Sequence, residues 1–204
     1  MTLENKLGIT SSSELARVEE KISKTRALKL FETGLLDTFE VGTYEGLSKI
    51  HKNLFEEIYD FAGKMRNVNI TKRSFRFVPA IYLKTALGNI AKMPQSTFDE
   101  IIEKYVEMNV AHPFREGNGR SVRIWLDSIL KKQLRLVVDW SKVDKEYYLF
   151  AMERSPVKDV EIKVLLKAAL TDKINDSEVF MKGIDASYHY EGYSTYKTEN
   201  LKNG

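Results

Sequence analysis

Cysteine is absent from this chain of 204 residues, histidine occurs only three times, and neither sign of charge dominates. Without cysteine the protein has no disulfides, no thiolate nucleophile and no cysteine-bound metal. Three histidines leave little scope for a histidine-rich metal site. The 32 basic residues exceed the 29 acidic ones only slightly, whereas a dedicated nucleic-acid-binding protein has a strong basic bias. The composition therefore argues against direct binding of nucleic acid.

Long apolar runs are missing as well. No stretch approaches the ~20 apolar residues that span a bilayer, and the first ten residues, MTLENKLGIT, lack the apolar core of a signal peptide. We therefore expect a cytoplasmic protein without membrane contact. Hydrophobic residues make up 43% of the chain and charged residues 30%, which is typical of a soluble globular domain with a real core.

Helical periodicity is the main pattern that the sequence does contain. Apolar residues recur at spacings of three and four, as at Leu47, Ile50 and Leu54. The pattern predicts a mostly α-helical protein, with helices in 44–66, 96–110, from the glycine stretch at 117–119 to 134, and in 141–152, 156–170 and 176–192. The expected end signals are Ser96 with Asp99, Ser141 with Asp144, Ser155 before Pro156, Asp176, Gly63 and Gly192.

One short segment breaks this pattern. Within residues 69–83, Phe75 and Phe77 alternate with other side chains, and Pro79 follows. A period of two predicts a strand, so we expect a small hairpin or an exposed strand. The polar residues after Tyr193 are expected to be loose.

The densest chemistry lies in HPFREGNGRSVR, residues 112–123. Gly117 and Gly119 allow a tight turn and a close approach of a ligand to the backbone. The helix that follows presents unpaired N–H groups at its positive end, which suits a phosphate. Arg120 and Arg123 are three residues apart, so both can lie on one helix face and bind a polyphosphate.

Two further residues complete a reactive site. Glu116 would repel phosphate unless a cation lies between them, and Mg²⁺ prefers carboxylate and phosphate oxygens together. His112 is the one side chain here that can take a proton near neutral pH. These features together predict a nucleotide-phosphate site with a general base beside it.

Each feature taken alone has a simpler explanation. A lone histidine before proline is more often a packed or surface residue, a Gly-Asn-Gly sequence is usually only a turn, and Arg123 could pair with Asp127. The segment also lacks the Walker and Rossmann patterns. Because all of these features fall within residues 112–123, a functional site is the better interpretation.

The segment resembles the Fic motif, H-x-F-x-[DE]-G-N-G-R-x-x-R, with every specified position filled. The resemblance extends over most of the chain, including VGTYEGLSKIHKNLFEEIYDFAG at 41–63 and the strand-like 69–83. It implies an all-α, mostly helical Fic fold with a small β-hairpin. It also implies a protein adenylyltransferase, which moves AMP from ATP to a protein hydroxyl with Mg²⁺ as cofactor.

The resemblance further implies a role for each residue of the motif. His112 deprotonates the target hydroxyl, Phe114 anchors the loop in the core, and Glu116 holds Mg²⁺. The expected phosphate contacts come from an anion hole of Gly117, Asn118 and Gly119 and from the side chains of Arg120 and Arg123. Positioning and charge neutralisation of this kind dominate phosphoryl transfer.

The hairpin also acquires a role from the resemblance. In Fic proteins it is a flap that pairs with the backbone of the target. Its expected working residues are Lys72, Arg73, Phe75 and Phe77, and the two basic residues are also expected to contact the nucleotide. The simpler alternative is that the phenylalanines are core and the basic residues are solvated; we expect one phenylalanine to pack inward.

A second motif is SYHYEG at 187–192. From spacing alone it fits a plain amphipathic terminal helix. It also matches the Fic inhibitory pattern, [ST]-x-x-x-E-[GN], of the small single-domain subclass known as class III. That resemblance implies that Ser187, Glu191 and Gly192 are inhibitory, with Glu191 paired to Arg123 where the γ-phosphate should lie. The enzyme is then expected to be autoinhibited.

The resemblance places the Fic domain at 1–193, its inhibitory helix at about 177–192, and a polar flexible tail at 194–204. Self-modification of a tyrosine near the site, Tyr188 first, is a candidate step that releases the helix. At least two of Tyr188, Tyr190 and Tyr193 are nevertheless expected to be core or interface. The expected partners are a protein target and further copies of the chain, because small Fic enzymes resembling this one form oligomers and are toxins against type II topoisomerase subunits.

Two other functions stay open. Glu191 could orient water, so that the protein also removes AMP from a modified target. Alternatively, the protein could be a non-catalytic, nucleotide-responsive adaptor that binds its partners through the flap. His112 argues against the adaptor, because a pure binding protein has no use for a base at this position.

Overall fold

The computed structural model describes residues 2–72 and 75–202. In chain order the described residues form the helices α1 (Ser12–Glu32), α2 (Tyr44–Phe55), α3 (Ala80–Lys92), α4 (Phe98–Ala111), α5 (Asn118–Leu134), α6 (Lys145–Arg154), α7 (Val160–Ala168) and α8 (Ser177–Tyr190). Short 3-10 helices are η1 (Leu35–Thr38), η2 (Trp140–Lys142) and η3 (Thr198–Leu201), and the strands are β1 (Thr71–Lys72), β2 (Phe75–Arg76), β3 (Val137–Val138) and β4 (Leu170–Thr171). The predicted mostly helical fold with a small hairpin is therefore confirmed.

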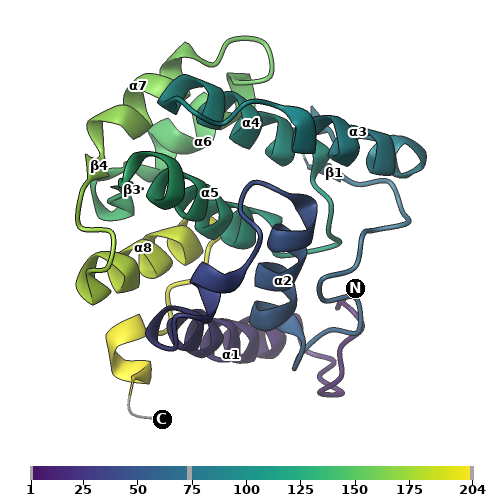
Figure 1. Ribbon diagram of the computed structural model, residues 1–204. Helices are drawn as coiled ribbons and strands as arrows, with labels where there is room; N and C mark the ends of the chain where they lie inside the picture. The colour runs from purple at the N-terminus through teal and green to yellow at the C-terminus, as the bar shows by residue number, and fades with distance from the viewer. Residues whose placement is uncertain (1, 73–74, 203–204) are drawn as a thin grey trace.

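Helix α5 lies at the centre of the molecule. It packs against α4, α2 and α8, and α1 closes the far side by packing on both α2 and α8 (Figure 1). A helix buried on all sides is normally apolar all round. The first turns of α5 instead bury Asn118, Arg120 and Arg123, so polar partners must reach them from neighbouring helices.

The apolar stripe of α2 shows why the sequence pattern worked there. Leu47, Ile50 and Leu54 are fully or almost fully buried, as their spacing predicts. The helix ends at Phe55, however, and not at Gly63. The side chains of Ser48 and His51 hydrogen-bond the backbone of Gly63, so the intervening chain folds back along the helix in turns.

Helix α1 was not expected from the apolar pattern. The reason is that its buried face includes charged residues, namely Glu19, Glu20 and Lys24. These side chains find partners on other elements, such as Asp185 on α8, which lies 2.9 Å from the Lys24 ammonium. Apolar periodicity cannot reveal a helix whose inner face is held by such ion pairs.

Several predicted helix starts were wrong by a few residues. The capping box of α4 is formed by Thr97 and Glu100 and not by Ser96 and Asp99. Ser155 ends α6 and does not open a helix, because α7 begins at Val160. Asp144, and not Ser141, caps α6, whereas Asp176 caps α8 as predicted. Both carboxylates accept hydrogen bonds from first-turn amides.

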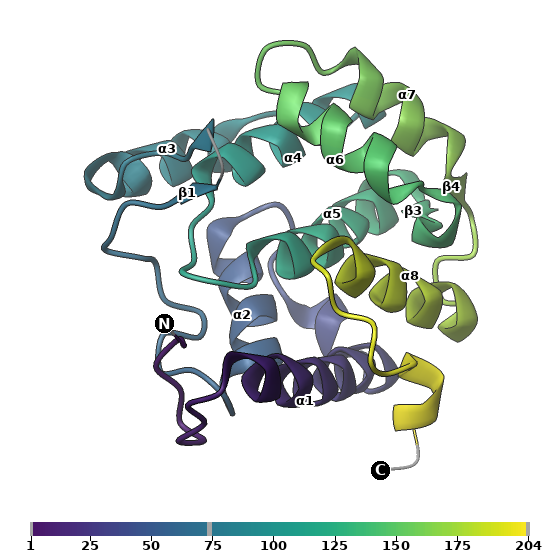
Figure 2. The same cartoon turned by 180° about the vertical axis from the view of Figure 1, so that it is seen from behind.

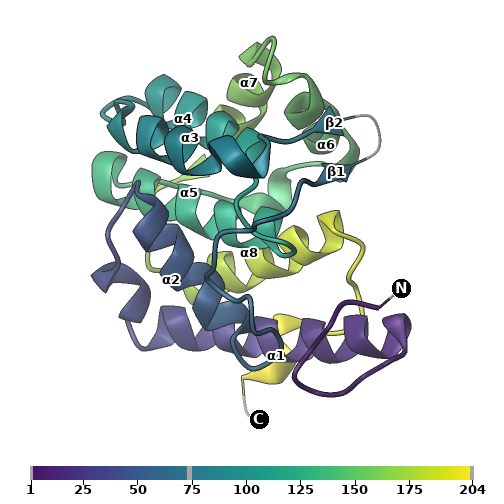
Figure 3. The same cartoon turned by 90° about the vertical axis from the view of Figure 1, so that its right-hand side faces the viewer.

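The predicted hairpin is present but short. Strands β1 and β2 pair antiparallel, with Thr71 opposite Arg76 and Lys72 opposite Phe75. Figure 3 shows the hairpin at the edge of the helical body. The end of the predicted strand-like segment is helical instead, since α3 begins at Ala80, directly after Pro79. A second antiparallel pair joins β3 to β4 on the opposite side of α5.

The chain after α8 turns back and crosses to α1 (Figure 2). The carboxylate of Glu20 accepts hydrogen bonds from the amides of Thr195 and Tyr196 at 3.0 and 3.1 Å. Thr198 and Leu201 are buried. Most of this segment, which we expected to be loose, is therefore packed against α1. Within the described residues, none of the helices combines the length and apolar character needed to cross a membrane.

Candidate active site

The loop between α4 and α5 carries the predicted site, and backbone geometry shapes both of its ends. His112 closes α4 in the left-handed conformation, with φ of 50°. Gly117 opens α5 with φ of 77°, and a Cβ there would overlap the ring of Phe55. Glycine is therefore required at this position for both conformation and space.

Phe114 and Asn118 hold the loop together from within. Phe114 is fully buried. The side-chain amide of Asn118 accepts a hydrogen bond from the N–H of Phe114 at 2.9 Å and donates one to its carbonyl at 2.7 Å. The side chain of Asn118 thus fixes the loop, and only its backbone N–H remains for an anion at the start of α5.

His51 on α2 supports the loop from below. Its Nδ1 accepts the N–H of Gly63 at 2.9 Å, so its Nε2–H donates to the carbonyl of Glu116 at 2.8 Å. Its ring stacks on Phe114 with a centroid distance of 3.8 Å. Burial lowers the pKa of His51 to about 3, so the ring is neutral and acts as a fixed link between α2 and the loop.

His112 has the environment of a neutral imidazole. Its ring stacks on Phe77 of the flap, 3.7 Å between centroids and nearly parallel. Burial, reinforced by the positive charge of Lys72, lowers the pKa of His112 to about 3, although Glu191 acts in the opposite direction. The imidazole is therefore unprotonated at neutral pH.

Glu116 lies at the positive end of α5. Its Oε1 accepts hydrogen bonds from the N–H of Gly117 at 2.9 Å and from Arg120 at 3.1 Å. No group of three or more His, Cys, Asp or Glu side chains that could hold a metal occurs in the described part of the chain. A single carboxylate suits Mg²⁺ when phosphate oxygens and water supply the remaining ligands, and the exposed Glu116 fits that use.

Arg120 points into the interior of the protein. Its side chain is 1% exposed and forms an ion pair with the equally buried Glu19 of α1. The guanidinium also lies over the rings of Phe55, Tyr188 and Tyr193, at 4.6 to 5.3 Å from their centroids. In this arrangement Arg120 joins α5 to α1 through Glu19. On the loop before α5 it contacts the carboxylate of Glu116.

Arg123 faces α8. Its Nε donates to the hydroxyl of Ser187 at 2.7 Å, and its Nη2 donates to the carbonyl of Ser187 at 2.9 Å and to Oε1 of Glu191 at 2.8 Å. Tyr148 accepts from Nη1 at 3.2 Å. The ion pair expected between Arg123 and Glu191 is therefore present, and α8 takes up most of the donors of Arg123.

Glu191 also covers the first turn of α5. A Cβ placed on Gly119 would overlap Oε1 of Glu191, so the carboxylate lies directly over the backbone of Gly119. Its other oxygen is 3.3 Å from the ammonium of Lys72. Burial opposes ionisation, but the charges of Arg123 and Lys72 outweigh it and lower the pKa of Glu191 to about 2. Glu191 is thus a carboxylate where an anion would meet α5.

Gly192 follows α8 with φ of 92°, as a C′ glycine does. The tyrosines around it are mostly interior. Tyr188 is fully buried and Tyr190 nearly so, with the Tyr190 hydroxyl donating to two backbone carbonyls. At least two of the three tyrosines are core, as expected. Tyr188, the first candidate for self-modification, has no exposed surface in this structure.

The flap residues divide by their surroundings. Lys72 is exposed except for its contact with Glu191, and Arg73 lies outside the described residues. Phe75 and Phe77 are half-buried and meet edge to face at 5.1 Å. Phe77 is the phenylalanine that packs inward, since it covers His112.

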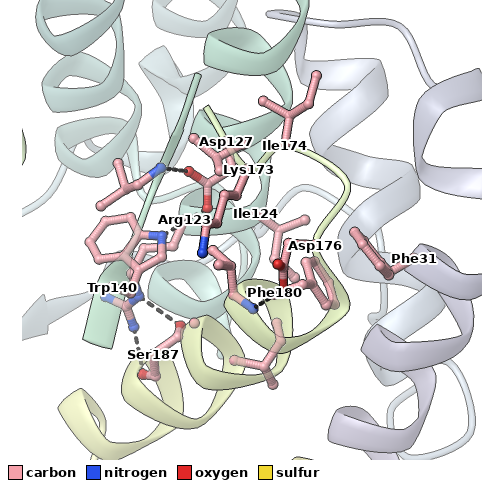
Figure 4. A pocket seen from close by; sticks show the side chains of 15 residues that line it. Phe31, Arg123, Ile124, Asp127, Trp140, Lys173, Ile174, Asp176, Phe180 and Ser187 are labelled. Atoms are coloured by element: carbon pink, nitrogen blue, oxygen red, sulfur yellow. Dashed lines mark hydrogen bonds between the residues drawn. The ribbon is translucent and has the colours of Figure 1, made fainter. Parts of the chain in front are cut away.

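A cavity of about 40 Å³ lies beside Arg123, between α5, α8 and η2 (Figure 4). Asp127 lines it and accepts hydrogen bonds from the N–H of Val138 and the indole N–H of Trp140. Burial raises the pKa of Asp127 to about 7. Arg123 bonds Ser187 and not Asp127, so the simpler Arg123–Asp127 pairing was wrong. The cavity is about the volume of one water molecule, far too small for a nucleotide.

Sequence reasoning missed three residues that build the site, namely Glu19, His51 and Arg66. His51 lies on the buried stripe of α2, next to Ile50, and this position was the available signal. The guanidinium of Arg66 donates to the carbonyl of His112, but nothing in its neighbouring sequence distinguishes it from a surface arginine. Glu19 is distant in sequence from its partner Arg120.

The sequence of this chain is similar to that of a known protein family. Residues 42–130 match the model of the Fic/DOC family. The chain is 31% identical over 155 residues to the protein adenylyltransferase VbhT of Bartonella schoenbuchensis, a match that covers 70% of this chain and 31% of that protein. It is 26% identical over 187 residues to the probable protein adenylyltransferase Fic of Escherichia coli, covering 86% of this chain and 90% of that one.

The fold is also similar to that of solved structures. The structure of BepC from Bartonella tribocorum, determined with bound AMPPNP, superposes with a TM-score of 0.68 at 19% identity, covering 84% of this chain and 93% of that one. The chain thus spans about a third of the length of VbhT but nine tenths of the Escherichia coli protein.

Proposed function

Residues 42–130 of this chain are a Fic domain, and on that premise we propose that the protein transfers AMP from ATP to a hydroxyl side chain of another protein. The observation that carries the proposal is the position of His112. His112 ends α4 on the loop that leads directly into α5, and its imidazole stays neutral at neutral pH. Curated relatives named protein adenylyltransferase support the same reaction.

The roles follow from the contacts. His112 accepts the proton of the attacking hydroxyl, which becomes nucleophilic as the proton leaves. The backbone of Gly119, which carries no side chain, and the N–H groups of the first turn of α5 receive the phosphates. Arg123 binds the terminal phosphate once Glu191 has left, since its guanidinium is a fixed fork suited to phosphate oxygens.

Glu116 holds Mg²⁺ in this proposal. The exposed carboxylate sits at the mouth of the site, and its hydrogen bonds to Gly117 and Arg120 fix its direction. The metal, when bound, neutralises phosphate charge. The protein's own contribution is to keep that carboxylate, the helix terminus and His112 in one rigid loop.

We also propose that the chain is autoinhibited. Glu191 occupies Arg123 and lies over Gly119, so a triphosphate in the same place would meet a negative charge and a missing cation. Misplacement of the α-phosphate by about 1 Å can cost about 100-fold in rate. Ser187 supports the inhibition, because it accepts from the Nε of the same arginine.

The experiment is a transfer assay with ATP labelled on its α-phosphate. Wild type, Glu191→Gly and Glu191→Gly with His112→Ala are incubated with Mg²⁺ and bacterial lysate. We expect labelled protein to form at least about 100-fold faster with Glu191→Gly than with wild type, and not at all with the double variant. Absence of protein-bound AMP with Glu191→Gly would overturn the proposal.

Mass spectrometry of the labelled proteins then identifies the acceptor. Type II topoisomerase subunits are the acceptors proposed from family resemblance, and the same spectra report whether tyrosine, serine or threonine carries AMP. A lysate spiked with purified topoisomerase subunits and one depleted of them provide the matched pair.

A further inference from the structure

Arg66 is a buried arginine whose partners are backbone carbonyls. It is 3% exposed and lies between α2 and the flap. Its Nε donates to His112 at 2.7 Å, its Nη1 donates to Val68 at 2.7 Å, and its Nη2 donates to Val78 at 2.5 Å and to Ala111 at 3.0 Å. The Arg66 amide itself donates to the carbonyl of Pro113 at 2.8 Å.

The four carbonyls bound by the guanidinium belong to two functional elements. Val68 and Val78 lie on the two arms of the flap, just outside strands β1 and β2. Ala111 and His112 end α4, and His112 carries the proposed base. A single guanidinium therefore bonds both arms of the flap and the backbone of the base at once.

Two further contacts lie alongside this guanidinium. The N–H of Val78 donates to the carbonyl of Val110 at 3.1 Å. The ring of Phe77, one residue earlier on the flap, stacks on the His112 imidazole at 3.7 Å. The flap and the imidazole are thus in contact through Phe77, and Arg66 hydrogen-bonds the backbone next to both sides of this contact.

Charge pairing does not account for a buried arginine here. No carboxylate forms an ion pair with Arg66 among the described residues, and burial lowers its pKa. Keeping an unpaired cation inside a protein opposes folding unless its hydrogen bonds are all satisfied. What arginine supplies is a rigid planar fork of five donors, which lysine cannot imitate.

We propose that Arg66 is a positioning residue that sets the separation between the flap and the His112 imidazole. This inference rests on the proposed function, since the flap matters only if it holds an acceptor. A target segment paired with the flap then arrives with its hydroxyl at a fixed distance from the base. Arg66 touches neither nucleotide nor acceptor and acts through the backbone of both elements.

The first test is kinetic and uses Glu191→Gly as the parent. Arg66→Lys keeps the charge but loses the fork, so transfer of labelled AMP to lysate proteins at saturating MgATP should fall by about 100-fold. The dissociation constant for MgATP, measured by calorimetry, should stay within about threefold. Arg26→Lys is the matched control, because Arg26 also donates to a backbone carbonyl, that of Asn53, outside the site. It should leave transfer unchanged.

The second test does not depend on activity. The chain has only three histidines, so carbon-13 labelling of histidine at Cε1 alone gives three ring signals in a magnetic resonance spectrum. Arg66→Lys should shift or broaden the signal of His112 and leave those of His51 and His189 in place. An unchanged His112 signal, or unchanged transfer, would overturn the inference.

The remaining outcomes are also decisive. If the Glu191→Gly parent transfers no AMP, the proposed function fails, while the histidine spectra still test Arg66. Arg66→Gln, which keeps two donors without a buried charge, is the second variant. Loss of cooperative unfolding in both Arg66 variants, with Arg26→Lys folded, would overturn the inference, because Arg66 would then support the fold and not the site.

Discussion

Arg120 and Arg123 lie one turn apart on α5, are almost equally buried, and each pair with a glutamate, but the two glutamates differ in exposure. Arg120 is paired with Glu19 of α1, which is itself 2% exposed. Arg123 is paired with Glu191, at the end of α8, whose side chain is 20% exposed and which also contacts the exposed Lys72. Both guanidiniums lie over aromatic rings, but the second pair alone opens to solvent at its acidic end.

The difference indicates which ion pair of the motif is fixed and which can separate. Glu19 cannot leave Arg120 unless the buried face of α1 is exposed to water. Its second carboxylate oxygen also accepts a hydrogen bond from the hydroxyl of Tyr59. Glu191 can leave when the last turn of α8 moves. The partner of Arg120 is therefore fixed inside the protein, while the partner of Arg123 lies at the partly exposed end of α8.

The largest expected effect compares the two arginines directly. Arg120→Gln leaves Glu19 as a buried charge without its main partner, and should lower the free energy of unfolding by about 3–5 kcal/mol. Arg123→Gln leaves Glu191 near Lys72 and water, and should cost about 1–2 kcal/mol. Urea unfolding measures both. Equal losses would remove the distinction between a fixed and an adjustable pair.

The next effect sharpens the comparison through pH. The pKa of Glu191 is lowered from its ordinary value of 4.5 to about 2. Its contribution to stability is therefore complete above pH 4.5 and is lost as the pH falls through 2. The difference in free energy of unfolding between wild type and Glu191→Gln should be constant from pH 8 to about 5 and shrink below that range.

The histidines do not disturb this comparison between pH 5 and 8, because His51 and His112 are present in both proteins and both imidazoles are neutral there in the folded state. Glu191 raises the pKa of His112, so Glu191→Gln alters the His112 contribution only where that imidazole titrates, near pH 3. Unfolding by urea at each pH measures the difference. A difference that already changes between pH 6 and 8 would show that Glu191 is not the strongly paired carboxylate that its contacts indicate.

A smaller effect is expected at Ser187. Its hydroxyl accepts a hydrogen bond from Arg123, so Ser187→Ala should lower the free energy of unfolding by about 1 kcal/mol. Because Glu191 still blocks Gly119, AMP transfer should rise less than with Glu191→Gly. The labelled-AMP assay ranks the variants. A larger rise in AMP transfer with Ser187→Ala than with Glu191→Gly would show that Glu191 is not the main inhibitory residue.

The smallest effect is expected at Lys72. Its ammonium is exposed and lies 3.3 Å from Glu191, and exposed ion pairs contribute little. Lys72→Ala should change the free energy of unfolding by no more than about 0.5 kcal/mol. Loss of several kcal/mol in thermal or urea unfolding would show that the flap, and not only Arg123, holds α8 in place.

The sequence predicted those parts of the site whose residues are neighbours in the chain or belong to a recognised motif. His112, Gly117 and Gly119 are linked by spacing and elementary conformational rules, and Arg123 with Glu191 was paired by two recognised motifs. The helical fold followed because the stripe of α2 and the central position of α5 both leave an apolar pattern.

The parts that escaped prediction depend on distant side chains. Glu19 and Arg66 are charged residues buried by partners far along the chain, and no local pattern distinguishes them from surface residues. The same reason hid α1, whose inner face carries Glu19, Glu20 and Lys24. Capping residues were misplaced by a few positions, because several polar residues near each helix start could serve.

The most direct test of the central claim is a calorimetric titration with MgATP. The account holds that Glu191 and a triphosphate compete for Arg123 and the first turn of α5. Glu191→Gly should bind MgATP at least about tenfold more tightly than wild type or than Glu191→Gly with Arg123→Gln, since a hydrogen bond to a charged group contributes about 1.5–3 kcal/mol. No detectable binding of MgATP by Glu191→Gly would contradict the account.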